Sequence, residues 1–272
     1  MTRHPDTYQG VGEPVGGDVS DPDSLGPALE GCEAAYYLVH SLDKPDFTED
    51  DAKGATAFAM AATHAELSRI VYLGGLGDDS DTLSAHLRSR RQVEQLLGST
   101  GVPTTVLRAG IIVGNGGISW EMTRQLVEHL PAMITPRWVH TRTQPIAVAD
   151  VVRYLVAVLE LPEAADRHFD IGGPEVLEYL EMMRRLGRIE GRRTLIVPVP
   201  LLTPSLSARW LSLVTSVDVT TGRSLIDSMT NEVVVQDDSI RKLVPFEPLD
   251  YDSAVLRALG ERARDARAKA GR

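Results

Sequence analysis

His86 and Arg90 stand four residues apart in a stretch, residues 83–97, whose apolar side chains recur with the period of an α-helix. Residues four apart share one face of a helix, and this pair falls within the apolar face rather than opposite it. Polar side chains turned toward a core need buried partners or a cleft. A histidine there could donate or accept a proton near neutral pH, and an arginine could hold an anionic group. His86 and Arg90 are therefore the predicted catalytic residues.

A purely structural explanation of the pair stays open. Arg90 could form an ion pair with Glu94, one turn further along the helix, and His86 could be a satisfied histidine at the edge of the core. Trp138 and Trp210 are candidates to line a substrate pocket, with ordinary core packing as the alternative.

The elements that must position this helix are short β-rich runs that alternate with helix-like stretches. This alternation is typical of an α/β fold with a parallel sheet and crossover helices. The predicted strands are residues 34–39, 70–73, 104–107, 145–148, 169–171 and 232–235. The predicted helices are residues 49–67, 83–97, 151–161 and 253–268, with Asp150 as the N-cap of the third. Residues 16–19 are expected to end a strand that turns into a short helix.

Composition and charge limit the classes of function. The chain has 272 residues and a net charge of −10, which argues against a nucleic-acid or anionic-membrane partner, because such partners need clustered Lys and Arg. The single cysteine, Cys32, leaves no internal disulfide and no thiol pair for zinc, so no metal is predicted and a cytoplasmic location is expected. The first ten residues lack an apolar core, so a signal peptide is not expected.

Several strand ends carry short motifs that together resemble the atypical short-chain dehydrogenases, and the NmrA-like NAD(P)H-binding proteins among them. The likeness runs from about residue 16 to the end of the chain. The motifs are residues 17–22, 36–41, 71–75, 86–90, 107–110, 136–138, 144–151 and 170–175. Their combination is specific for the superfamily but not for a reaction.

The resemblance implies a Rossmann-type, doubly wound parallel sheet that binds NADP or NAD. It implies that Asp18 and Val19 lie beside the adenine. It further implies roles along the ribose for Leu38, Val39, His40 and Ser41, and at the nicotinamide for Arg108, Gly110 and Ile111. His86 and Arg90 stand where active members have Tyr and Lys, and the family's serine position has glycine (Gly74-Gly75).

No G-x-G-x-x-G fingerprint for a diphosphate occurs in the sequence. We therefore expect the first βαβ unit of the doubly wound sheet to be absent from this chain. Its absence would expose a sheet edge at residues 34–39. It would also remove the helix N-terminus that binds the diphosphate, so this chain alone is expected to be unstable or to bind dinucleotides poorly.

The sequence predicts an incomplete NAD(P)-binding domain, residues 1–175, and a smaller C-terminal substrate lobe, residues 176–272. The leading hypothesis is an oxidoreductase or epimerase-like enzyme that acts on an unknown small molecule. The alternative is a non-catalytic, NAD(P)H-sensing regulator, which the replaced Tyr and Lys favour. A remnant that no longer binds the cofactor is the third explanation. A homodimer is compatible with all three.

Overall fold

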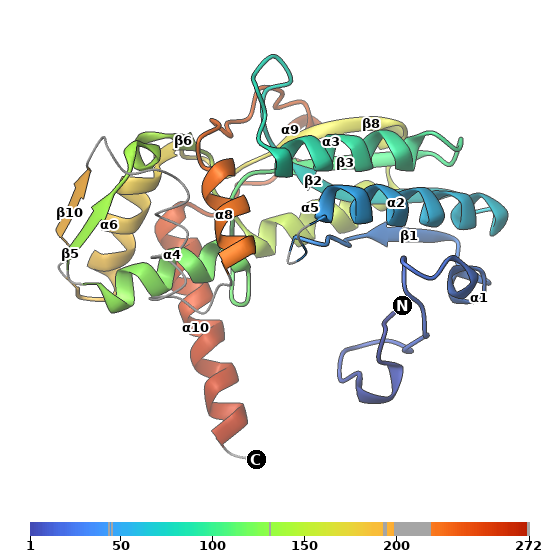
Figure 1. Ribbon diagram of the computed structural model, residues 1–272, viewed down its shortest axis with the longest axis horizontal. Helices are drawn as coiled ribbons and strands as arrows, with labels where there is room; N and C mark the ends of the chain where they lie inside the picture. Colours follow the sequence, from blue (N-terminus) through green and yellow to red (C-terminus); the bar gives the residue numbers. More distant parts are fainter. Residues whose placement is uncertain (43, 45, 131, 193–194, 199–218, 271–272) are drawn as a thin grey trace.

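The computed structural model describes residues 1–42, 44, 46–130, 132–192, 195–198 and 219–270. Its centre is a parallel sheet in the order β1-β2-β3-β8 (Figure 1). These strands are β1 (Ala34–Tyr37), β2 (Arg69–Gly75), β3 (Thr104–Ala109) and β8 (Arg167–Ile171). The predicted α/β fold with a doubly wound parallel sheet is confirmed, and four of the predicted strands form its centre.

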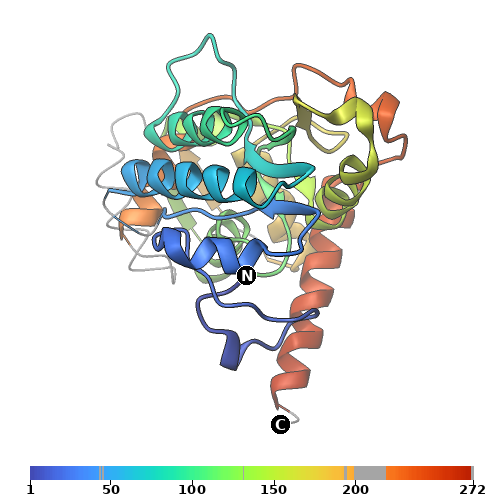
Figure 2. The same cartoon turned by 90° about the vertical axis from the view of Figure 1, so that its right-hand side faces the viewer.

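Helices cover both faces of this sheet (Figures 1 and 2). On one face, α2 (Phe47–His64) and α3 (Ala85–Gly98) bury their apolar stripes against Tyr72 and its neighbours. On the other face, α5 (Val148–Glu160) packs against a second cluster, which includes Val71. Tyr72 and Val71 are both fully buried, which is expected for adjacent residues of a strand that is covered on both faces.

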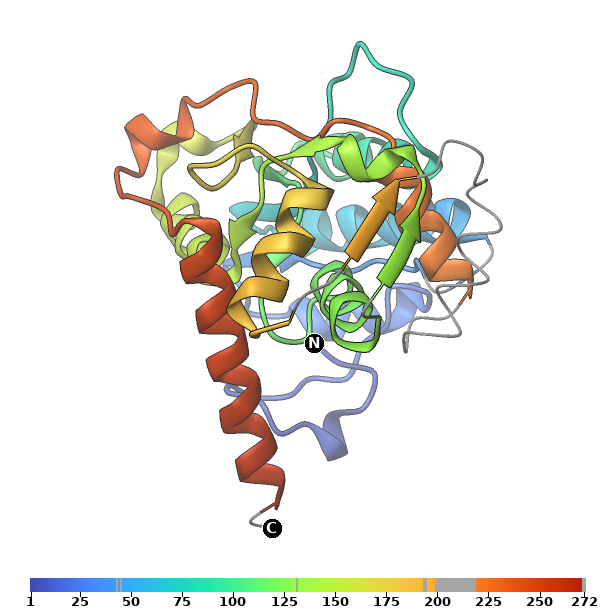
Figure 3. The same cartoon turned by 90° about the vertical axis from the view of Figure 1, so that its left-hand side faces the viewer.

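The remaining elements surround this sheet and continue the molecule beyond one of its ends. There, α4, α6, α10 and a small two-stranded sheet pack together (Figure 3). Three two-stranded sheets pair β5 with β10, β4 with β7, and β6 with β9. The elements are η1 (Pro5–Thr7), η2 (Pro22–Ser24), α1 (Leu25–Leu29), β4 (Ile112–Val113), α4 (Ile118–His129), β5 (Ala132–Thr135), η3 (Arg137–His140), β6 (Arg142–Thr143), β7 (Ile146–Ala147), η4 (Pro162–Ala164), β9 (Leu177–Glu178), α6 (Tyr179–Ile189), β10 (Leu195–Pro198), α8 (Val219–Ser228), α9 (Ile240–Leu243) and α10 (Tyr251–Ala270).

A further apolar core lies beyond the end of the central sheet. It contains Trp120 and Ile111 together with Tyr179, Leu225 and Val255. Residues from both sides of position 175 thus share one core, and the division into two domains stays a prediction.

Three local predictions were wrong. Residues 16–19 form only isolated bridges, because the described chain offers them no longer strand to pair with. Residues 232–235 form one bridge to Thr143, and the Val235 N–H donates to the Gln144 side chain instead of to a strand. Asp150 is not an N-cap, because α5 begins at Val148; its carboxylate accepts a hydrogen bond from the Leu249 N–H at 2.8 Å.

β1 is an edge strand in the part of the chain that the structure describes. Tyr36 and Leu38 are 40% and 53% exposed, and the Tyr36 hydroxyl donates to the Leu155 carbonyl at 3.2 Å. The predicted edge at residues 34–39 is therefore present within the described residues. No helix of the described chain has both the length and the apolar character needed to cross a bilayer.

Candidate functional site

A cavity of about 80 Å³ lies at the carboxyl ends of the central strands, where ligands bind in open α/β sheets. Gly75 at the end of β2 and Gly110 just after β3 form part of its wall, together with His86 of α3. Ser119 of α4, Tyr179 of α6 and Ser228 of α8 complete the polar part of the lining. Most of the other lining residues are aliphatic, so the cavity suits an apolar group with one or two polar atoms.

The structure brings the two predicted catalytic residues together. Arg90 Nε lies 3.3 Å from His86 Nε2, and His86 Nδ1 lies 3.1 Å from the Ser228 hydroxyl. A guanidinium can only donate, so Nε2 is the acceptor and the ring proton belongs on Nδ1, which donates to Ser228. Both ring nitrogens of a neutral imidazole are therefore engaged.

The same surroundings hold His86 in its neutral form. Burial, then the positive charge of Arg90, and then His40 lower the pKa of His86 from 6.5 to about 3. Desolvation disfavours the imidazolium, and the adjacent cation adds to that effect. At neutral pH His86 can thus shape the cavity and donate one hydrogen bond, and its catalytic role stays a prediction.

This burial predicts a stability that depends on pH. The unfolded chain protonates His86 at about 6.5 and the folded chain only at about 3, so the unfolded state binds more protons between these values. His86 should therefore contribute a loss of stability of at most about 1.4 kcal/mol per pH unit as pH falls from 6.5 toward 3. Urea unfolding of His86→Gln should give a flatter pH dependence than the wild type. His64→Gln changes an exposed histidine and is the control; an equal slope for all three proteins would contradict the prediction.

A hydrogen-bond network connects α3 to the segment around α8. Ser84 caps α3 by accepting the Leu87 N–H at 3.3 Å, and its hydroxyl lies 3.1 Å from that of Ser228. The Ser84 N–H donates to the Asn231 side chain at 2.9 Å. Sequence reasoning missed Ser228 and Asn231, because neither belongs to a motif and both are far from α3 in the chain.

Arg90 does not pair with Glu94, so that half of the structural alternative was wrong, whereas its other half, a satisfied His86, agrees with the hydrogen bonds at both ring nitrogens. Glu94 is held by Arg108, whose Nη2 and Nε lie 2.7 and 3.1 Å from its carboxylate oxygens. Arg90 Nη1 instead reaches the Val39 carbonyl at 3.5 Å, at the predicted ribose side of the cofactor. The Arg108 guanidinium is thus committed to Glu94, and its role at the nicotinamide stays a prediction.

The predicted ribose loop, residues 38–41, is held by a buried carboxylate. Asp51 of α2, 5% exposed, accepts the Ser41 N–H at 2.8 Å and the Ser89 hydroxyl at 3.2 Å. Sequence reasoning missed Asp51, although it lies on the same helix face as the buried residues Ala55 and Ala59. The sequence did contain a signal for Asp51, namely an acidic residue on a helix face that carries a stripe of alanines.

The predicted adenine residues approach the same part of α2. A Cβ on Gly54 would lie 2.9 Å from Val19 Cγ2, so the absence of a side chain there lets Val19 approach the helix closely. Hydrogen bonds from the Ser20 N–H and hydroxyl lower the pKa of Asp18. Because residues 51 and 54 are one turn apart, α2 holds Val19 and Ser41 on neighbouring positions.

These residues fit the ribose and nicotinamide parts of a dinucleotide. A Cβ on Gly110 would lie 3.3 Å from Val233 and 3.4 Å from the Thr143 hydroxyl, so glycine keeps the cavity wall open. Within the described residues, no glycine-rich turn leads directly from a strand of the central sheet into a helix N-terminus; the glycine-rich residues 114–117 lead instead from β4 into α4. His40, Ile111 and Leu38 also lie just beyond the ends of β1 and β3.

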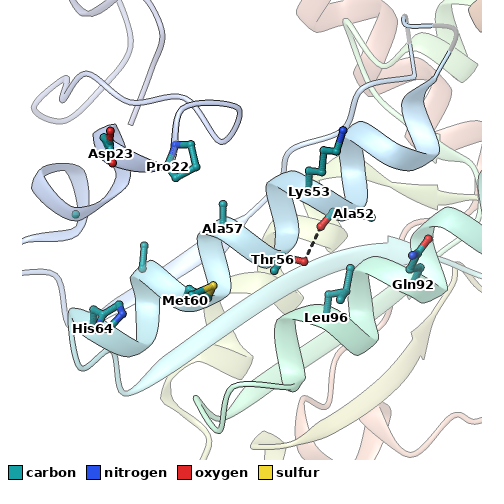
Figure 4. A pocket seen from close by; sticks show the side chains of 12 residues that line it. Pro22, Asp23, Ala52, Lys53, Thr56, Ala57, Met60, His64, Gln92 and Leu96 are labelled. Carbon is teal, nitrogen blue, oxygen red and sulfur yellow. Dashed lines mark hydrogen bonds between the residues drawn. The ribbon is translucent and has the colours of Figure 1, made fainter.

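A larger hollow, about 720 Å³, lies elsewhere, on the outer side of α2 (Figure 4). Met60 and Ala57 of α2 and Leu96 of α3 line it, facing Pro22. It shares no residue with the strand-end cavity and carries no group that could exchange protons with a cofactor near His86.

Two other predictions concern tryptophan and metal. Trp138 is buried and packs edge-on against the Tyr179 ring, with centroids 5.7 Å apart, and Trp210 lies outside the described residues. In the described part of the chain, no group of three or more His, Cys, Asp or Glu side chains is arranged to hold a metal.

Known proteins are similar to this chain in sequence. Sanguinarine reductase of Eschscholzia californica is 26% identical over 200 residues, covering 57% of this chain and 70% of that protein. The photosystem II assembly factor Ycf39 of Trieres chinensis is 23% identical over 192 residues, covering 70% of this chain and 59% of that protein. The chain thus spans less than two thirds of the length of that second relative.

Solved structures show the same fold at low identity. The NADPH-dependent quinone oxidoreductase of Escherichia coli, complexed with NADPH, superposes with a TM-score of 0.71 at 18% identity over 89% of this chain and 82% of that one. The triphenylmethane reductase of Citrobacter sp., complexed with NADP(H), gives a TM-score of 0.69 at 16% identity, with the same coverage of both chains. The resemblance to atypical short-chain dehydrogenases is confirmed. Residues 1–162, more than half of the chain, match the family described as NAD(P)H-binding, and the chain belongs to that family.

Proposed function

We propose that this protein is an NAD(P)H-dependent reductase that acts on a small, apolar acceptor with a carbonyl or quinone-like group. The observation that carries this proposal is the cavity at the ends of β2 and β3, whose wall is mainly aliphatic and whose histidine is neutral. Three proteins that the chain resembles are named as reductases of sanguinarine, of quinones and of triphenylmethane dyes, which supports the reaction class.

The chain's own residues would hold the cofactor, which supplies a hydride when it is bound. The loop of residues 38–41, tied to Asp51, would bind the ribose through its backbone. Gly110 and Ile111 would face the nicotinamide, and Asp18 and Val19 the adenine. Arg90 would fix the tautomer of His86, so that the imidazole bounds the cavity without carrying charge.

The test is binding followed by turnover. NADPH and NADH are titrated separately into the purified chain and followed by cofactor fluorescence. NADPH oxidation is then measured with menadione and with an aromatic aldehyde as acceptors. Cofactor binding with acceptor-dependent oxidation supports the proposal, whereas the absence of binding would instead favour a remnant.

Gly110→Ala should separate cavity chemistry from general folding. The added methyl group meets Val233 and Thr143 at 3.3 and 3.4 Å and narrows the wall, so kcat/KM should fall about tenfold or more. Gly98→Ala is the matched control, since a Cβ there meets no other atom within 4 Å. Equal losses in both variants would contradict a reaction in this cavity.

One observation favours a second candidate, a regulator that senses NAD(P)H. Both nitrogens of His86 are already bound, and the Tyr and Lys of active relatives are replaced. Tight cofactor binding with no oxidation by any acceptor would support the regulator. A cytoplasmic location and a homodimer stay predictions.

A further inference from the structure

Tyr179 is the first residue of α6 and lines the same cavity as His86 and Gly110. Its side chain is almost entirely buried, and its ring is fixed edge-on against Trp138. The pair formed by β6 and β9 sets its position, because Leu177 and Glu178 of β9 lead directly into α6.

The Tyr179 residue is part of the cavity lining. Its polar neighbour is the Thr143 side chain, and the Thr143 hydroxyl is 3.4 Å from where a Cβ on Gly110 would be. Gly110 is itself part of the cavity wall. Thr143 Oγ1 is buried and makes no hydrogen bond of good geometry, so its contact with Tyr179 is loose and can rearrange for a ligand.

Two other polar groups of the cavity, His86 and Ser228, are already occupied. His86 uses both ring nitrogens, and Ser228 lies 3.1 Å from both His86 and Ser84 while donating to the Ser224 carbonyl at 2.8 Å. Tyr179 and Ser119 are the described side chains of the lining whose hydroxyls no rigid network holds, and of the two the phenol of Tyr179 is the stronger hydrogen-bond donor.

Resting on the reductase function proposed above, we propose that the Tyr179 hydroxyl donates a hydrogen bond to the oxygen of a substrate carbonyl in this cavity. As the carbonyl carbon gains a hydride, the C–O π pair moves onto the oxygen, and the Tyr179 O–H stabilises the resulting negative charge. A proton from water then completes the alcohol. With a quinone, the hydride adds to the ring carbon conjugated to the carbonyl, the charge again moves onto the oxygen beside Tyr179, and protonation followed by tautomerisation gives the hydroquinone; Tyr179 remains a phenol throughout.

Burial raises the pKa of Tyr179, and the Thr143 contact only partly opposes that effect. The phenol therefore keeps its proton at neutral pH and can act as a donor. The cavity of about 80 Å³ is smaller than the cavity of about 150 Å³ that benzene fills, so it would admit the oxygen of a substrate and the carbon that bears it, while the rest of the ring would lie outside the cavity.

The first measurement needs no cofactor. 4-Nitrophenol, at a pH where it is ionised, presents a phenolate oxygen to Tyr179 and reports binding by its visible absorbance. Tyr179→Phe should bind this probe at least about tenfold more weakly than the wild type, as expected for one hydrogen bond to a charged oxygen. Tyr154→Phe is the control. Tyr154 of α5 is similarly buried, but its ring packs against Phe246 and it lines no part of this cavity.

The second measurement is turnover. Tyr179→Phe should lower kcat for menadione about 100-fold, the usual loss for one oxyanion donor, with the NADPH dissociation constant unchanged. Thr143→Val, which keeps the side-chain shape, removes the contact that competes for the Tyr179 hydroxyl, so it should tighten probe binding. Circular dichroism checks that each variant is folded.

The proposal is overturned if Tyr179→Phe binds the probe and reduces menadione as well as the wild type does. It is also overturned if the wild type does not bind the probe. If Tyr179→Phe does not fold, unchanged probe binding by Thr143→Val also counts against it. A wild type that binds the probe through Tyr179 but never oxidises NADPH would refute the reductase function and still support the hydrogen-bond site.

Discussion

Replacing Glu94 with alanine is expected to lower the free energy of unfolding by about 3 kcal/mol, the largest stability loss we predict for this chain. Glu94 holds Arg108 by two hydrogen bonds, and the side chains of Arg108 and Glu94 are only 9% and 15% exposed. Without Glu94, the buried guanidinium keeps only Asp79, 3.5 Å away on an exposed loop. An uncompensated buried charge is more costly than the absence of the whole pair.

Urea unfolding of two variants and their combination tests this reasoning. Glu94→Ala alone should show the loss, and Glu94→Ala with Arg108→Met should recover at least half of it, because the second change removes the stranded charge. Glu94→Gln keeps the shape and an acceptor oxygen, so its loss should be intermediate. A double variant no more stable than Glu94→Ala would show that Arg108 does not carry the cost.

Asp51→Ala should destabilise the fold by about 2 kcal/mol and weaken cofactor binding about tenfold. The substitution leaves the Ser41 N–H and the Ser89 hydroxyl without their shared acceptor. An unsatisfied buried donor carries its full desolvation penalty. The loop of residues 38–41 also loses its attachment to α2, so the ribose side of the site is no longer held in place.

The matched control is Asp50→Ala, the neighbouring acid on α2. Asp50 is 36% exposed and pairs with Lys44 at 2.8 Å, an exposed contact worth at most about 1 kcal/mol. Thermal unfolding and NADPH titration are measured for both variants. Similar losses in the two would mean that Asp51 acts only as one more surface charge, contrary to the geometry.

The sequence predicted the central architecture because local patterns determine it. The strands at residues 70–73 and 104–107 differ from β2 and β3 only in their ends, and the helix at residues 83–97 shares most of its length with α3. The helical period also placed His86 and Arg90 on one inward face, where the structure has them in contact. Periodicity therefore located the candidate pair.

Partners fixed by tertiary structure were not predictable from the same patterns. Glu94 is one turn from Arg90, yet it binds Arg108 on an adjacent strand, because β3 brings that guanidinium closer with two donors aligned. Tyr179 and Ser228 reach the cavity from α6 and α8, far from α3 in the chain. Residues 232–235 look like a strand, but Val233 packs into a small apolar cluster beneath α3.

The register of the central sheet has a consequence for how the chain folds. Ala34 pairs with Arg69, Ile70 with Thr104, and Thr105 with Arg167, so every pairing joins residues about 35 to 60 positions apart. No strand pair of this sheet can form from a short hairpin, and each requires the closure of a long loop before any ladder stabilises it. Folding should thus be slow for a chain of this size. We expect β2 to nucleate the sheet, because it pairs on both sides with strands that are closer in sequence than those of any other pairing in this sheet.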